Sequence, residues 1–435
     1  MHLSRRFTPT FASMTILAKY LIVGLALCLT AACAQKQDKP QLMSKREPSA
    51  AEVILGAEIY RLDRKLQNCL SSGPITITAF PSERSTGGLH DFYSDGDDWW
   101  PESNEPDLAS SANGDPEENV NFVSHREALI RFSNIVATLT SAYLISGNNQ
   151  YTDKAAQHLK AWFVDPATRM NPSLRYARTI GGSDNDGIHI MDTIHLTEIA
   201  RSVKVLSAYK SLKISDERAI REWFGDYLTW LTTHPFGTQA RDADDDTTAL
   251  AWAIQVAAIA DLLNNQDQLA QIRNNFKRRF VGKMMAFDGS LQARPYGRQL
   301  FVLDSMATVA QIASVEDDDL WRYQAEDGRG MARAVEHMLP YLSKKTLSKN
   351  TLSSLPQSAA SEDELPVRRS SLAFAALAYT DRSYLDLWQP LQADPKESRV
   401  LRKLPVRHPL LWLPNNLPQA VEEVEVATNT ATLVQ

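Results

Sequence analysis

The sequence predicts an all-α fold in which helical hairpins stack in a ring or superhelix within one domain. Three observations support this prediction. From about residue 52 to 410, apolar residues recur at three- and four-residue steps, which is the period of an amphipathic helix. Alternation with a period of two, which strands would need, is nearly absent. Helices of similar length are joined by loops rich in Gly, Asn, Asp and Pro, as expected for stacked hairpins.

The leader, residues 1–33, has the marks of a secretory signal. Basic residues precede the apolar run YLIVGLALCLTAAC, which is too short for a comfortable membrane span, and the polar stretch AQKQDKPQ follows. LTAAC resembles a bacterial lipobox, with Cys33 as the residue that is lipidated. Ordinary cleavage near Ala34, or an uncleaved anchor, are the alternatives, and each predicts export. We therefore expect a periplasmic or cell-surface protein, lipid-anchored through Cys33, or otherwise a secreted one.

The remaining elements follow in order. Residues 34–55 are rich in Lys, Gln, Pro and Ser and are predicted to be a polar tether. Residues 56–412 form the helical body. Within it, residues 343–364 have a low-complexity polar character and are predicted to form a mobile loop, and residues 413–435 a frayed tail. The strongest helical segments are HREALIRFSNIVATLTSAYLISG, YTDKAAQHLKAWF, DTIHLTEIARSVKVLSAYKSL, DERAIREWFGDYLTWL, TALAWAIQVAAIADLL, QLAQIRNNFKRRF, LDSMATVAQIA and MARAVEHMLPYL.

The net charge and the cysteine content exclude several kinds of partner and site. The formal net charge of −6 and the lack of a basic stripe argue against a nucleic-acid partner, and membrane contact is expected only through a lipid anchor. A local group of arginines can still bind an acidic ligand. Two of the three cysteines lie in the leader, which excludes a disulfide framework and a Cys-based zinc site.

The stretch GGLHDFYSDGDDWWP, residues 87–101, fits no helix or strand period and is predicted to be an ordered loop just before the first strong helix. Aromatic faces cover the apolar side of a sugar ring, while acids and amides bind its hydroxyls. Trp99 and Trp100 are therefore candidates for sugar binding, although they could instead plug the end of the ring. His90 and Tyr93 either contact substrate or support the loop.

Beyond these residue patterns, most of the mature chain, from about 75 to 390, resembles the alginate lyase domain superfamily of bacterial polysaccharide lyases, in its glucuronan and alginate lyase branch. The resemblance implies an (α/α) toroid, an incomplete barrel of helical hairpins in a single domain. It also implies β-elimination on a uronate polymer, which needs a group that neutralises the carboxylate, a base and an acid, but no redox cofactor. The segments that carry it are GGLHDFYSDGDDWWP, NFVSHREALIRFS, GIHIMDTIHL, LTTHPFG, WAIQVAAIA, PYGRQLFVLDSMATVAQIA and LPVRRSSLAFAALAY with YLDLW.

Several polar positions depart from the family pattern. Asp245, Asp246 and Thr247 stand where the family carries Asn-Asn-His, and Arg298 stands where it carries a tyrosine. Further departures are Val302 for asparagine, Asp186 for arginine, His189 for glycine, and ASSANG at 109–114 for Tyr-Ile-Arg-Arg-Asp-Gly. The packing segments between them survive, so the pattern predicts a retained scaffold whose original chemistry is lost or remade.

The candidate catalytic residues are Tyr296 as acid or base, Arg298 as carboxylate clamp and His189 as a relocated base. Each also has a structural alternative, since a tyrosine can pack, an arginine can face solvent and a lone histidine can be a satisfied structural group. His125 and Arg126 open a strong helix and either orient the preceding loop or contact substrate. The remaining candidates for substrate binding are Arg294 and Asp246.

The run DADDD could hold calcium, which takes several oxygen ligands. A cap by Thr247 or Asp246 at a helix N-terminus explains the acids without metal, and no cofactor is otherwise expected.

Three functions remain open. The first is an exported lyase acting on a uronate polysaccharide of the alginate or glucuronan type. The second is a catalytically silent carbohydrate-binding surface protein on the same scaffold. The third, weaker one is a hydrolase that uses paired aspartates. The first two expect an acidic polysaccharide as partner, and the sequence leaves open which polymer is bound and whether the site is active.

Overall fold

The computed structural model describes residues 47–95, 121–177, 190–291, 296–342 and 367–413. Its contacts divide the chain into two units, Met1–Glu47 and Pro48–Gln435, and every element below belongs to the second. Within the described ranges there are helices and isolated β-bridges but no strand. The predicted all-α class is confirmed.

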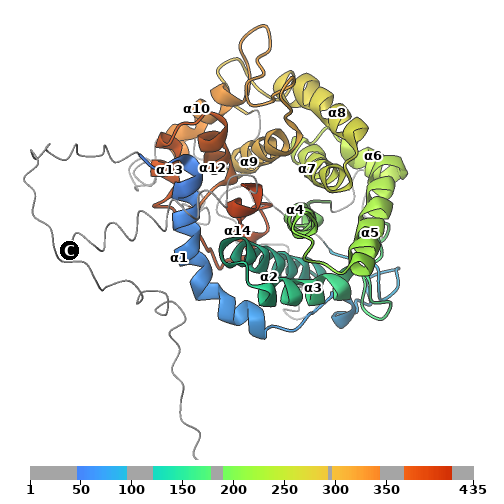
Figure 1. Ribbon diagram of the computed structural model, residues 1–435. Helices are drawn as coiled ribbons and strands as arrows, with labels where there is room; N and C mark the ends of the chain where they lie inside the picture. The colour runs from blue at the N-terminus through green and yellow to red at the C-terminus, as the bar shows by residue number, and fades with distance from the viewer. Residues whose placement is uncertain (1–46, 96–120, 178–189, 292–295, 343–366, 414–435) are drawn as a thin grey trace, which may run out of the picture. The chain divides into compact units, whose positions relative to one another are not determined.

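The helices of this unit form two concentric circles (Figure 1). The predicted toroid of hairpins is confirmed. The inner circle consists of α2 (Ser124–Ser146), α4 (Leu196–Ala208), α7 (Asp246–Leu263), α9 (Tyr296–Ala313) and α12 (Ser370–Ala378). The outer circle consists of α1 (Ala50–Ser71), α3 (Asn149–Phe163), α5 (Ile214–Thr233), α6 (Pro235–Asp242), α8 (Gln266–Asn275), α10 (Met331–Leu342) and α13 (Ser383–Trp388). Shorter elements are η1 (Ile77–Ala79), η3 (Ile190–Thr193), the π-helix η4 (Phe276–Val281), α14 (Ser398–Leu401) and η5 (Pro409–Trp412).

The apolar pattern of a helix explains whether it lies in the inner or the outer circle. In α7, 14 of the 18 residues are buried, because an inner helix has neighbours on all sides. In α3 the buried residues form one stripe, which faces inward. Helices α2 and α7 are long and apolar enough to cross a bilayer, but 72% and 78% of their apolar windows are buried in the ring, as in a protein core.

Neighbouring inner helices run in the same direction. Between α2 and α4, Arg126 Nη1 lies 3.1 Å from Asp192 Oδ1 just before α4 begins, and the rings of Tyr143 and Tyr209 lie 5.8 Å apart where both helices end. An ion pair likewise joins the starts of α7 and α9. The N-termini of these inner helices therefore gather at one end of the ring, which we call the rim.

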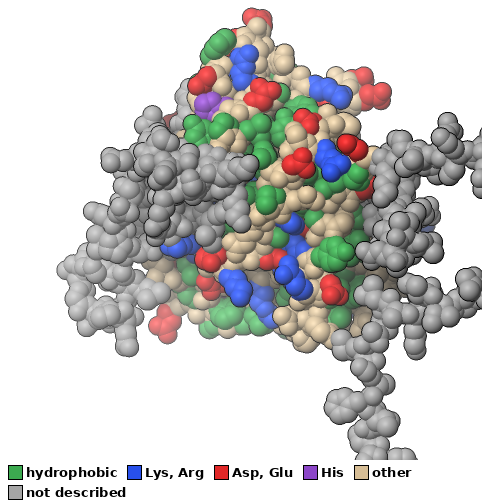
Figure 2. All heavy atoms as spheres, turned by 90° about the vertical axis from the view of Figure 1, so that its left-hand side faces the viewer, with side chains coloured by type: hydrophobic (Ala, Val, Ile, Leu, Met, Phe, Trp, Pro, Cys, Tyr) green, Lys and Arg blue, Asp and Glu red, His purple; other side chains and the backbone are tan. Residues whose placement is uncertain are grey.

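The first helix begins earlier than expected. Ser49 caps α1, and Ser49 and Glu52 exchange hydrogen bonds between side chain and backbone in a capping box. Residues 50–55, assigned above to the tether, are therefore helical. Figure 2 shows the face of the ring that carries α1, where charged side chains lie among apolar ones. The leader, the segment 343–364 and the tail from residue 414 lie outside the described residues.

The C-terminal segment, residues 402–413, packs among the inner helices, next to α14 at the centre of the ring (Figure 1). Leu410 and Leu411 are fully buried, and Arg201 of α4 donates from Nε to the carbonyl of Leu411 at 2.7 Å. Trp412 packs edge-on against Phe374 of α12, with ring centroids 5.5 Å apart. This segment therefore completes the core of the ring.

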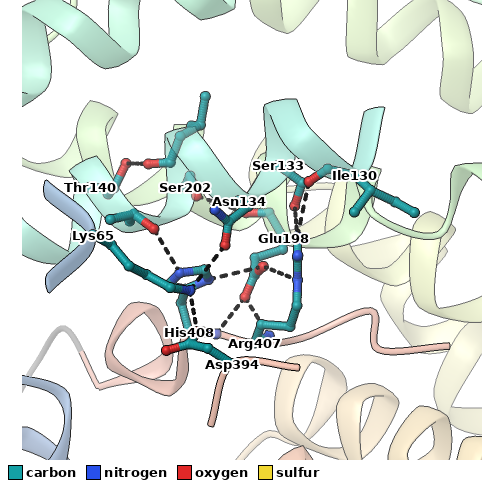
Figure 3. Close-up of polar contacts among 12 residues, drawn as sticks. Lys65, Ile130, Ser133, Asn134, Thr140, Glu198, Ser202, Asp394, Arg407 and His408 are labelled. Atoms are coloured by element: carbon teal, nitrogen blue, oxygen red, sulfur yellow. Dashed lines mark hydrogen bonds and ion pairs between the residues drawn. The ribbon is translucent and has the colours of Figure 1, made fainter. Parts of the chain in front are cut away.

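A buried polar network fixes this segment (Figure 3). Glu198 of α4 accepts the backbone N–H groups of Arg407 and His408, each at 2.7 Å. His408 places Nδ1 3.2 Å from Glu198 Oε2, and its Nε2 lies 3.0 Å from Thr138 Oγ1 and 3.5 Å from Arg61 Nη2. The guanidinium beside Nε2 disfavours a second proton on the ring.

The charge states of this network follow from burial and contacts. Burial alone would raise the pKa of Glu198, but the facing His408 and Arg407 outweigh it and lower that pKa to about 2. Burial is also the largest cause that lowers the pKa of His408 to about 4. At neutral pH Glu198 is therefore an anion and His408 is neutral.

Candidate functional site

The candidate site is the rim, where the starts of the inner helices bring together residues far apart in sequence. Arg298, in the first turn of α9, forms an ion pair with Asp245, which immediately precedes α7. Both side chains are partly exposed, at 29% and 40%. Of the predicted catalytic residues, Arg298 is the one whose side chain is described, and it lies at the rim.

Asp245 is held firmly in place. It caps α7 by accepting the backbone N–H groups of Thr247 and Thr248 at 3.3 and 3.2 Å. The hydroxyls of the same two threonines donate to its Oδ2 at 2.7 Å each. The cap is thus Asp245, and the expectation that Thr247 or Asp246 caps the helix is wrong. The carboxylate that replaces an amide of the family pattern serves both the helix and the arginine.

Asp246, predicted to bind substrate, is the first residue of α7 and is partly buried. Burial raises its pKa, and the nearby Arg279 opposes this rise. Arg279 is itself fixed by donating to the carbonyl of Arg241 at 2.8 Å and to that of Ala243.

The described part of the opening loop is held by its own side chains. His90 is partly exposed, and its Nδ1 lies 2.6 Å from the carbonyl oxygen of Arg169. Tyr93 is fully buried, and its hydroxyl donates to Asp95. Asp95 in turn accepts from Arg84 at 2.5 Å. Tyr93 therefore supports the loop and does not present a surface to substrate.

His125 and Arg126, at the start of α2, are both buried. Nδ1 of His125 accepts the backbone N–H of Tyr93 at 3.0 Å, and its Nε2 donates to the carbonyl of Phe80 at 2.8 Å. Burial lowers the pKa of His125, which keeps the ring neutral, as these two bonds require. Arg126 forms a buried ion pair with Asp192. The geometry favours the loop-orienting alternative for this pair over contact with substrate.

The other predicted residues are not placed. Trp99, Trp100, His189 and Arg294 lie outside the described residues, as does Cys33. Tyr296 begins α9, but its side chain is not described. The sequence predicts that Trp99, Trp100 and Tyr296 converge with Arg298 on one crevice, and this stays a prediction.

Sequence reasoning missed two buried partners. Asp192 pairs with Arg126, although it appeared only as part of the motif IMDT. Asp304 accepts the backbone N–H and the hydroxyl of Ser371 at 3.1 and 2.6 Å, and lies 3.4 Å from Arg369 Nη1 at the start of α12. An isolated aspartate inside an apolar helix pattern is a signal that could have marked both.

The acidic run before α7 is largely occupied by internal partners. Asp242 accepts from Arg241 at 2.8 and 2.6 Å, and Asp245 serves the cap. In the part of the chain that the structure describes, no group of three His, Cys, Asp or Glu side chains could hold a metal ion. The calcium alternative stays untested.

The chain is similar to known proteins in both sequence pattern and structure. The family model described as alginate lyase matches residues 76–347. An alginate lyase from Bacteroides ovatus has a similar structure, with a TM-score of 0.66 and 24% identity over 84% of this chain and 98% of that chain. Alginate lyase A1-III from Sphingomonas species A1 aligns with a TM-score of 0.47 and 13% identity over 83% of this chain and 96% of that one. No curated protein matches the chain in sequence.

Proposed function

Because the chain belongs to the alginate lyase family, we propose that it is an exported polysaccharide lyase that cleaves alginate or a related uronate polymer by β-elimination. The match over residues 76–347 carries this proposal, since it spans the rim from the opening loop to α9. The helical ring supports it, because such a scaffold leaves its loops free to build a polymer site.

The elimination needs a group that neutralises the substrate carboxylate, so that the neighbouring C–H becomes acidic. Arg298 fits this role, since a guanidinium binds a carboxylate with two parallel hydrogen bonds. To do so it must exchange Asp245 for the substrate. Asp245 would keep its bonds from Thr247 and Thr248, so this exchange leaves no bare carboxylate behind. Tyr296 and His189 are the candidates for proton transfer.

A second candidate, binding without cleavage, is favoured by the start of α7. The position where the family carries a histidine holds Thr247, whose hydroxyl donates to Asp245 and cannot act as a base near neutral pH. The protein would then hold an acidic polysaccharide at the cell surface. The hydrolase alternative lacks such support, because Asp242 and Asp245 both hold an arginine partner.

A cleavage assay separates these functions. We expect the purified protein to release unsaturated products that absorb in the ultraviolet from alginate or a glucuronan. Tyr296→Phe and Arg298→Gln should each lower turnover by about 100-fold or more. The matched controls are Tyr60→Phe and Arg322→Gln, at positions 79% and 74% exposed, and they should leave the rate unchanged.

Two outcomes decide against the lyase, and a third decides against one residue. Binding of polymer without new absorbance or new reducing ends establishes the silent binding protein. New reducing ends without absorbance establish hydrolysis. If Tyr296→Phe keeps the full rate of elimination, the role of Tyr296 is wrong.

The proposed export and anchor have a separate test. The lipidated protein should be found with membranes after cell fractionation, and Cys33→Ser should move it into the soluble or secreted fraction. A wild-type protein that stays in the cytoplasm would remove this part of the proposal.

A further inference from the structure

A cavity of about 470 Å³ opens between α1, the first three turns of α2 and the segment 393–401. It shares no lining residue with the rim pair Arg298 and Asp245. Its size is that of a small-molecule site, which spans roughly 300–1,000 Å³. Figure 2 shows Lys and Arg side chains, with Asp and Glu side chains among them, on the face of the ring that carries α1. Figure 3 shows four polar residues that line the cavity, namely Lys65, Asn134, Asp394 and Arg407.

The walls of the cavity carry four cationic side chains and two carboxylates. Both carboxylates have internal partners. Asp394 accepts from Arg61 Nε at 3.0 Å and pairs with Lys65 as well. Glu127 accepts from the hydroxyl of Ser398 at 3.4 Å.

Of the four cations, Lys65 and Arg407 are engaged. Lys65 pairs with Asp394, and Nε of Arg407 lies 3.8 Å from Glu198 in the buried network. Arg131 and Lys396 differ, because their side chains make no hydrogen bond or ion pair within the described ranges. Glu127 has a hydroxyl and no cation as its partner among the described residues, so two cations stand against one carboxylate at the cavity. This leaves a local positive potential in a chain whose net charge is −6.

The rest of the lining suits a sugar. Asn134 accepts from Lys65 through Oδ1 at 3.4 Å, which leaves its NH₂ group to donate. Ile130 and Leu401 add apolar surface on the same walls. Cations, an amide donor and apolar surface match the carboxylate, the hydroxyls and the C–H face of an acidic sugar ring.

We propose that this cavity binds one hexuronate residue, with Arg131 and Lys396 on its carboxylate. The site shares no residue with the rim pair Arg298 and Asp245 and needs no chemistry from that pair. The choice of a hexuronate among carboxylates rests on the proposed function. A polymer that is bound both in this cavity and at Arg298 would stay attached when one of the two contacts opens.

The test is calorimetric titration of the full-length protein with sodium glucuronate, in an Arg298→Gln background that removes the rim clamp. We expect a dissociation constant in the millimolar range. Arg131→Gln with Lys396→Gln should weaken binding about tenfold or more, with an unchanged circular dichroism spectrum. The control Arg64→Gln alters an exposed arginine of α1 that does not line the cavity, and it should leave binding unchanged.

Glucose and sodium sulfate are the competing probes. Sulfate that binds as tightly as glucuronate shows a general anion site, and glucose that does so shows no role for the carboxylate. Either result overturns the proposal, as does a double variant that binds like its parent. Loss of binding in the double variant, in a protein that makes no unsaturated products, keeps the cavity site and removes the lyase.

Discussion

Replacing Glu198 by Gln should weaken the fold by about 3 kcal/mol at pH 7. The pKa of Glu198 falls from its ordinary value of 4.5 to about 2 in the folded protein. Each pH unit of that fall corresponds to about 1.36 kcal/mol, which gives about 3 kcal/mol for the charged form. The amide keeps an oxygen for the two backbone N–H groups but leaves the buried Arg407 without its anion, a loss of roughly 3–5 kcal/mol in buried pairs.

The assay is urea unfolding followed by tryptophan fluorescence, at pH 7 and again near pH 3. Because the folded pKa lies below the unfolded one, the contribution of Glu198 is fully present above pH 4.5 and is lost as the pH falls toward 2. The gap between wild type and variant should therefore shrink in acid. Glu222→Gln, on the exposed side of α5, is the control and should change stability by less than about 0.5 kcal/mol.

Two results would refute this reasoning. One is a Glu198→Gln protein that unfolds at the same urea concentration as wild type at pH 7. The other is a gap that stays equally large near pH 3, which would mean that the charge of Glu198 is not its cause.

Three further predictions concern His408, the rim and the start of α6. The pKa of His408 is lowered to about 4, so between pH 6.5 and 4 the folded state binds fewer protons than the unfolded one. The free energy of unfolding should therefore fall as the pH decreases from 6.5 to 4. His408→Gln should flatten this part of a stability curve measured against pH. Asp245→Ala should cost about 1–2 kcal/mol through the lost cap of α7, yet tighten uronate binding in titrations by freeing Arg298. Asn265→Ala, which removes the cap of α8, should lose stability with no change in binding, and equal binding in both variants would contradict the clamp. Gly237→Ala should lower the urea midpoint, because its new Cβ would meet a backbone carbonyl oxygen at 2.4 Å; an unchanged midpoint would contradict that contact.

The helical hairpins could be predicted from the sequence because their signals are local. The run that became α2 ends in Gly147, which adopts a left-handed φ of 65° and stops the helix as expected. The start of α1 also has a local signal, since Ser49 and Glu52 have the spacing of a capping box, but the Lys, Gln, Pro and Ser content around it favours a tether.

The site was less predictable because its contacts are between distant residues. The pair of Arg298 and Asp245 spans two helices, and no local pattern states that their starts meet. The burial of Tyr93 and His125 could not be predicted either. Both are residue types that often bind substrate, but here they support the loop. The sequence identifies the chemical group at each position. Which groups become neighbours is decided by the packing of the ring.

The placement of residues 402–413 at the centre of the ring has a consequence for the order of assembly. A polypeptide is synthesised from its N-terminus, so the hairpins emerge from the ribosome long before the segment that fills the space between them. An incomplete nascent chain carries the inner helices with their apolar surfaces uncovered. Closure must wait until translation has passed His408, so every hairpin of the ring is synthesised before the ring can close.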